Sequence, residues 1–104
     1  MPSLPKTVVQ TFPAHVEPAA LRQLLEETRG REILLQQVIR QSEQRYGCSL
    51  EELEGRLARG EGREHPDWED SIEWRNAIEA LQRTQLLRSI LEWLIDSLAS
   101  SPAS

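Results

Sequence analysis

The chain has 104 residues, of which 38% are hydrophobic, and it carries 12 Lys or Arg against 17 Asp or Glu. A chain of this length forms one domain with one modest core. The net charge of -5 argues against a strongly basic nucleic-acid binder. No apolar run approaches the ~20 residues that a membrane span needs. The first residues lack the apolar core of a signal peptide. Cys48 is the single cysteine. We therefore expect a cytoplasmic protein that is not bound to a membrane.

The charge is divided unevenly along the chain. Residues 1–46 hold six basic and five acidic residues, whereas residues 47–104 hold six basic and twelve acidic ones. This division permits a near-neutral N-terminal part and an acidic C-terminal part.

Residues 1–17 form a predicted N-terminal arm, in which residues 6–12 are the only strand candidate, rich in β-branched residues and closed by Pro13. A lone strand leaves its backbone hydrogen bonds unsatisfied, so a strand here would pair with the same strand of a second copy. A coil arm is the alternative. Two paired strands could enter a DNA major groove, with contacts to nucleic acid from Lys6, Thr7, Gln10, Arg22 and Arg31. An arm without a nucleic-acid role is the simpler interpretation.

Apolar residues at helical spacing follow from Pro18, which suits a first helical turn, to Tyr46. Gly30 interrupts the pattern, so residues 18–46 form either two helices or one helix that tolerates a glycine at a cost of ~1 kcal/mol. Gly47 is a typical helix stop. Ser49, three residues before Glu52, predicts the capped start of a short helix from about Leu50 to Arg59.

A last helix is predicted from Trp68 to about Leu98, with Asp67 as its cap and a bend or break at Thr84-Gln85. We therefore expect a mostly α fold of about four helices with a short N-terminal strand. The helical domain covers residues 18–98, and a frayed tail covers residues 99–104.

Nothing in the sequence predicts catalysis. The acidic residues around His65 lack the spacing of a metal site, and a helix-capping loop explains them. Cys48 lies directly before the Ser49 cap, where it serves as a small turn residue. No phosphate-cradling glycine loop is present. We expect no catalytic residue, no metal and no cofactor.

The segment 86–98 is unusually apolar, since eight of its thirteen residues are Leu, Ile or Trp. Arg88, Glu92 and Asp96 are spaced to form a narrow polar face. The remaining apolar arc is wider than one neighbouring helix covers. Either the other helices of the chain bury it, or it also serves as a dimer or partner interface. The candidate interface residues are Trp68, Trp74, Leu87, Leu91, Trp93 and Leu94.

Several short motifs occur in a fixed order: RYG at 45–47, SLEE at 49–52, GE at 60–61 and HPDWED at 65–70. Over about residues 31–95 the chain resembles small bacterial antitoxins of type II toxin–antitoxin modules. Many such antitoxins begin with a ribbon-helix-helix unit, from which the imperfectly alternating strand and the Arg29-Gly30 turn of this chain depart.

The resemblance implies a non-catalytic protein that neutralises a cognate toxin by docking helix surface and acidic residues, and that works as a homodimer or larger assembly. Binding of its own promoter is a weaker implication. The acidic half would complement the basic surface of an RNA-cleaving toxin. The alternative hypothesis is a structural or scaffold protein that self-associates through the last helix and has no toxin. A third, weaker hypothesis is a DNA-binding regulator that acts through residues 6–31.

Overall fold

The computed structural model of the chain describes residues 17–61 and 64–99. They form three helices, α2 (Pro18–Tyr46), α3 (Leu50–Ala58) and α4 (Glu64–Ala99). The mostly α fold is confirmed, but these residues form three helices instead of about four, and none of them is in a strand. The strand expected at residues 6–12 lies outside the described residues.

The first helix is continuous through Gly30, so residues 18–46 are one helix. It begins with Pro18 at its first position, where a missing N–H costs nothing. It ends at Gly47, whose φ of 62° is left-handed and whose N–H donates to the Glu43 carbonyl at 2.8 Å. Glycine adopts this conformation without the steric cost that a Cβ brings, so the predicted stop is confirmed.

The short helix α3 begins where the sequence predicted. The Ser49 hydroxyl accepts a hydrogen bond from the Glu52 N–H at 3.2 Å, which confirms the cap. The helix ends at Ala58, within one residue of its expected end.

The last helix begins earlier than expected and does not break. It begins at Glu64, so Asp67 lies inside the helix and the prediction that it is the cap is wrong. Pro66 is tolerated because the first helical turn does not need its N–H. The helix is also continuous through Thr84, whose hydroxyl donates to the Ala80 carbonyl at 2.7 Å. A threonine bonded in this way stays within the helix.

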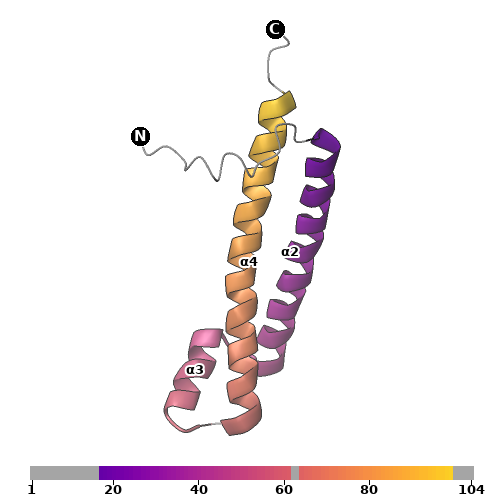
Figure 1. The fold of residues 1–104 in the computed structure, drawn as a ribbon. Helices are drawn as coiled ribbons and strands as arrows, with labels where there is room; N and C mark the ends of the chain where they lie inside the picture. The colour runs from indigo at the N-terminus through magenta and orange to yellow at the C-terminus, as the bar shows by residue number, and fades with distance from the viewer. Residues whose placement is uncertain (1–16, 62–63, 100–104) are drawn as a thin grey trace, which may run out of the picture.

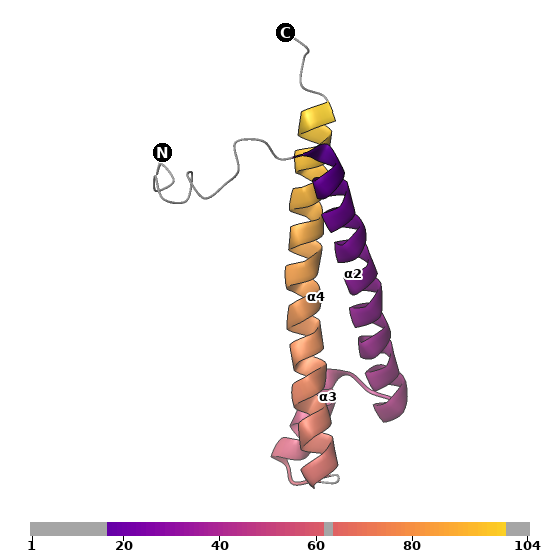
Figure 2. The ribbon, with the colours of Figure 1, turned by 45° about the vertical axis from the view of Figure 1, so that its right-hand side comes forward.

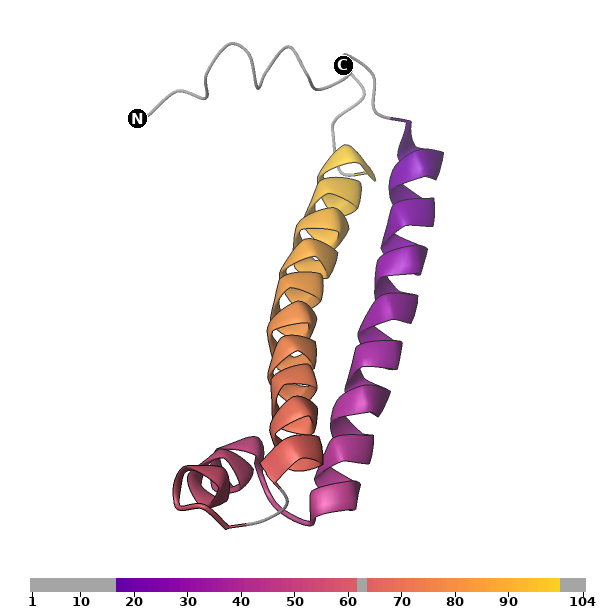
Figure 3. The same cartoon turned by 60° about the horizontal axis from the view of Figure 1, so that its bottom comes forward.

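The helices α2 and α4 lie side by side and antiparallel along their length, so that the chain forms an elongated helical hairpin (Figures 1 and 2). We call the end where Tyr46 lies near Asp70 the closed end, and the end where Pro18 lies near Leu98 the open end. The short α3 packs beside α4 at the closed end, as Figure 3 shows. Among the described residues, the open end therefore consists of the two long helices.

The best-packed part of the core is at the closed end. Leu50 and Leu53 of α3 bury Trp74 of α4, and all three are at most 3% exposed. Five partly buried side chains surround them: Ile39, Tyr46, Cys48, Leu57 and Ile78. The Tyr46 and Trp74 rings stack with centroids 6.2 Å apart. A third helix thus completes the core at this end.

Charged residues join the two long helices in the middle of the hairpin. Arg88 Nε donates to Glu32 Oε2 at 2.6 Å, and Arg88 Nη1 donates to Glu92 Oε1 at 2.7 Å. Arg29 Nη2 lies 3.9 Å from the same Glu92 oxygen. Arg88 and Glu92 therefore face α2. The sequence had suggested instead that they lie on a polar face of α4 directed at solvent. Their hydrogen bonds, first with Glu92 and then with Glu32, raise the pKa of Arg88.

Candidate functional site

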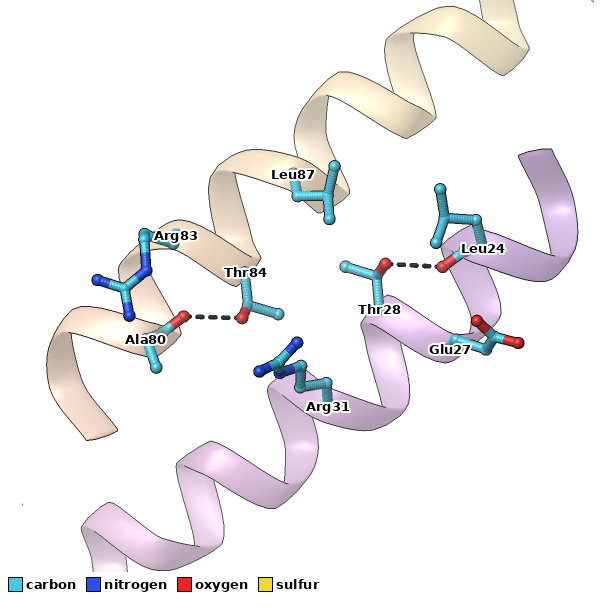
Figure 4. Close-up of a pocket in the computed structure, with 8 residues that line it drawn as sticks. All are labelled: Leu24, Glu27, Thr28, Arg31, Ala80, Arg83, Thr84 and Leu87. Atoms are coloured by element: carbon cyan, nitrogen blue, oxygen red, sulfur yellow. Dashed lines mark hydrogen bonds between the residues drawn. The ribbon is translucent and has the colours of Figure 1, made fainter. Parts of the chain in front are cut away.

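A shallow groove runs between α2 and α4 on the side of the hairpin away from α3. Ile78 packs against the α3 core, and Leu87 follows it nine residues later. Nine residues are about two and a half helical turns, so Leu87 projects from the opposite side of α4. We call this hollow the front groove (Figure 4). It is lined by Leu24, Glu27, Thr28, Arg31, Ala80, Arg83, Thr84 and Leu87.

The floor of the front groove is narrow and presents few free polar groups. Thr28 and Thr84 are 5% and 7% exposed. Each hydroxyl donates at 2.7 Å to a carbonyl of its own helix, that of Leu24 for Thr28 and that of Ala80 for Thr84. The two bonds are drawn in Figure 4. Since these hydroxyls are already satisfied, the floor favours contact with apolar side chains.

The rims of the front groove carry exposed apolar side chains. Leu24 and Leu87 are 42% and 41% exposed. Leu34 and Val38 continue the α2 rim at helical spacing and are also exposed. The hollow has a volume of about 270 Å³, below the roughly 300–1,000 Å³ of small-molecule sites. The shape and the lining suit a helix better than a cofactor.

A second apolar surface lies on the outer side of α4 near the open end. Leu86, Ile90 and Trp93 occupy positions i, i+4 and i+7 and so share one stripe of the helix. All three are exposed, and Trp93 most of all at 66%. We call these three residues the outer face of α4. An exposed tryptophan beside two exposed aliphatic residues is typical of a protein-binding surface.

The structure divides the six predicted interface residues into buried, half-buried and accessible ones. Trp74 and Leu91 are 2% and 3% exposed and belong to the core of the chain itself. Leu94 is half-buried. Three residues are accessible at the surface: Trp68, Leu87 and Trp93.

The candidate nucleic-acid residues do not come together in the described part of the chain. Arg22 and Arg31 are nine residues apart on α2, so they project from opposite sides of the helix. Lys6, Thr7 and Gln10 lie outside the described residues. The two described arginines therefore do not form one phosphate-binding surface.

Asp67 and Asp70 have a structural role that the sequence analysis did not predict. The Tyr46 hydroxyl donates to Asp70 Oδ2 and, at 3.4 Å, to Asp67 Oδ1. Arg45 Nη1 lies 3.3 Å from Asp70 Oδ2. Burial, followed by the hydrogen bond to Asp70, raises the pKa of Tyr46. No local pattern could have revealed this contact, because its partners are 24 residues apart.

Sequence reasoning also missed the α2 side of the front groove. Leu24, Arg31 and Val38 are seven residues apart and form one stripe, a signal that was present in the sequence. The stripe was not recognised as a separate surface because Leu24 and Val38 also fit the apolar pattern of the core face.

Two further kinds of site are absent from the described residues. Within residues 17–61 and 64–99, no group of three or more His, Cys, Asp or Glu is arranged to hold a metal ion. None of the helices in these ranges has the length and apolar character needed to cross a membrane.

Comparison of the chain with protein-family models, with curated proteins and with solved structures found no match.

Proposed function

We propose that this chain is a non-catalytic protein-binding module of the antitoxin type, which neutralises a cognate toxin by docking the outer face of α4 against it. The observation that carries the proposal is the exposure of Trp93, at 66%, beside the exposed Leu86 and Ile90. Burying one large apolar side chain on association contributes roughly 1.5–3 kcal/mol. Tryptophan is also the residue type that most often anchors protein interfaces.

The charge around this surface supports a basic partner. The chain from residue 47 onward carries twelve acidic and six basic residues. Glu79 and Asp96 are exposed on α4 on either side of the outer face along the chain. Acidic residues around an apolar anchor speed association with a basic surface and select against acidic proteins. An RNA-cleaving toxin has such a basic surface, because its substrate is anionic.

Co-expression of the full chain with the product of each neighbouring gene tests this proposal. We expect a stoichiometric complex with a small basic protein and rescue of growth from its toxicity. The variants Leu86→Ala and Trp93→Ala should weaken the complex. Ile33→Ala is the matched control, because Ile33 is also exposed, at 53%, but lies on α2. Loss of binding in all three variants, or no bound neighbour, would contradict the proposal.

A self-associating scaffold without a toxin is the second candidate, and the front groove favours it. Its apolar rims and satisfied floor lie beside the outer face of α4, and Ile90, three residues after Leu87, borders both surfaces. A stable oligomer of the chain alone, with no neighbouring gene product bound, would support this candidate over the antitoxin.

A further inference from the structure

We propose that the front groove is occupied by a second copy of this chain, and that the two hairpins pack antiparallel about a two-fold axis to form a four-helix bundle. This inference does not depend on a toxin. It rests on the order of residues along the groove, which is complementary to itself when one copy is reversed.

The α2 side of the groove has alternating three- and four-residue spacing. Leu24, Glu27, Arg31, Leu34 and Val38 follow one another at the spacing of an antiparallel coiled-coil seam. When two such helices run in opposite directions about a point midway between Glu27 and Arg31, Glu27 of one copy faces Arg31 of the other. The same register places Leu24 of one copy against Leu34 of the other. Each of these contacts is thus apolar with apolar or acidic with basic.

The residues on the α4 side of the groove are also complementary to themselves when one copy is reversed. Arg83, Leu87, Ile90 and Leu94 have the same alternating spacing. Reversal about a point midway between Leu87 and Ile90 places each Leu87 against Ile90 of the other copy, so that Ile90 belongs to the seam and Leu86 and Trp93 remain as the free part of the outer face of α4. It also places Arg83 near Leu94 of the other copy, where the aliphatic stem of an arginine packs while its charged group stays in water.

The two midpoints lie within about one helical turn of each other along the hairpin, so a single axis serves both helices. The α2 midpoint is at residue 29, and the α4 midpoint lies between residues 88 and 89. The contacts of Arg29 with Glu92 and of Glu32 with Arg88 place these parts of α2 and α4 at one level. This agreement follows from contacts within one chain and is independent of the pairing across the groove.

Charge also selects the antiparallel arrangement over the parallel one. Arg31 and Arg83 line the same hollow. Within the part of the chain that the structure describes, neither has an ion-pair partner. A parallel dimer would bring α2 of one copy against α4 of the other at equal height, and four guanidinium groups would meet at one level. The antiparallel dimer instead gives each Arg31 a carboxylate.

The area available is sufficient for a stable dimer. In this register α2 overlaps its copy from Pro18 to Arg40, which is about 33 Å of helix. Two neighbouring helices are about 20 Å wide, so each copy contributes roughly 660 Å² and the dimer roughly 1,300 Å². Stable interfaces bury about 1,200–2,000 Å² in total. The short α3 lies on the opposite side of the hairpin and does not obstruct this contact.

Charge reversal tests both the dimer and its register. In sedimentation equilibrium the full chain should have twice its mass of 11.9 kDa. Glu27→Arg and Arg31→Glu should each weaken the dimer at least about tenfold, because each places like charges together twice. Mixing the two variants in equal amounts should restore a dimer, since both basic side chains of one copy then face the acidic side chains of the other. The double variant E27R/R31E should restore it alone.

Arg22→Glu is the matched control, because it makes the same charge change on the same helix outside the stripe and should leave the dimer intact. Circular dichroism of each variant checks that the helices persist. A monomeric wild-type chain would overturn the proposal. Single variants that dissociate but fail to pair on mixing would overturn the antiparallel register.

Discussion

The phenol of Tyr46, the last residue of α2, donates a hydrogen bond to the carboxylate of Asp70 in the second turn of α4. This contact joins the end of one long helix to the start of the other, across the segment that contains α3. The Tyr46 ring also stacks on Trp74, the best-buried side chain of the core. Tyr46 therefore connects the charged rim of the closed end to its apolar centre.

Replacing Tyr46 with Phe tests this connection. The ring stacking is kept, while the hydrogen bonds to Asp67 and Asp70 are lost. We expect the free energy of unfolding to fall by about 1–3 kcal/mol, because hydrogen bonds to charged groups are stronger than neutral ones. Urea denaturation measures the change. An unchanged denaturation midpoint would show that the phenol hydroxyl contributes nothing.

The same residue predicts a dependence of stability on alkaline pH. The pKa of Tyr46 is raised above its ordinary value of about 10 by burial and by Asp70. The folded chain therefore holds the phenol proton more tightly than the unfolded chain does. The resulting stability is fully present below about pH 10 and is lost as pH rises toward the folded pKa. Tyr46 is the only tyrosine, so its absorbance reports its titration alone. Tyr46→Phe should lose stability less steeply above pH 10.

The glycines at 30 and 47 should respond to alanine in opposite ways. A Cβ at either position meets nothing within 4 Å, so packing does not distinguish them. Gly47 has a φ of 62°, and Gly47→Ala should destabilise the chain by roughly 1–2 kcal/mol because a left-handed alanine is strained. Gly30→Ala should stabilise it by roughly 0.5–1 kcal/mol because Gly30 lies within a helix. Thermal melting of the two variants at one protein concentration compares them.

Ser49→Ala should lower the free energy of unfolding by about 1 kcal/mol, because the Glu52 N–H loses its acceptor. Ser49→Asp is the control, since a carboxylate also caps a helix and should retain most of the stability. Chemical denaturation of both variants gives the comparison. Equal losses in both would mean that the cap does not stabilise α3.

Leu91 and Leu86 differ in burial although both are leucines of α4. Leu91 is 3% exposed, whereas Leu86 is 64% exposed. Leu91→Ala should destabilise the chain by about 2–5 kcal/mol through the cavity it leaves. Leu86→Ala should change its stability by less than about 0.5 kcal/mol. Similar denaturation midpoints for the two variants would contradict the placement of α4 against α2.

Local sequence signals were sufficient where the structure depends on residues close together in the chain. The cap at Ser49 and the stop at Gly47 were predicted correctly because their hydrogen bonds span three or four residues. The Asp67 cap was predicted wrongly because Pro66 was assigned to a loop, although proline also fits the first turn of a helix. Several residues can satisfy the same cap rule, so a helix start is less certain than the helix itself.

Propensity and capping act within a few residues, so the amino-acid sequence was enough to establish that the chain is helical, where α3 starts and where α2 stops. The burial of Trp74 and the exposure of Trp93 depended on the packing of the helices, although both residues lie on apolar stripes of α4. Periodicity reveals that a helix has apolar faces but not which face a neighbour covers. At the closed end α3 covers Trp74, whereas toward the open end no further helix within residues 17–61 and 64–99 covers the outer face of α4 or the front groove.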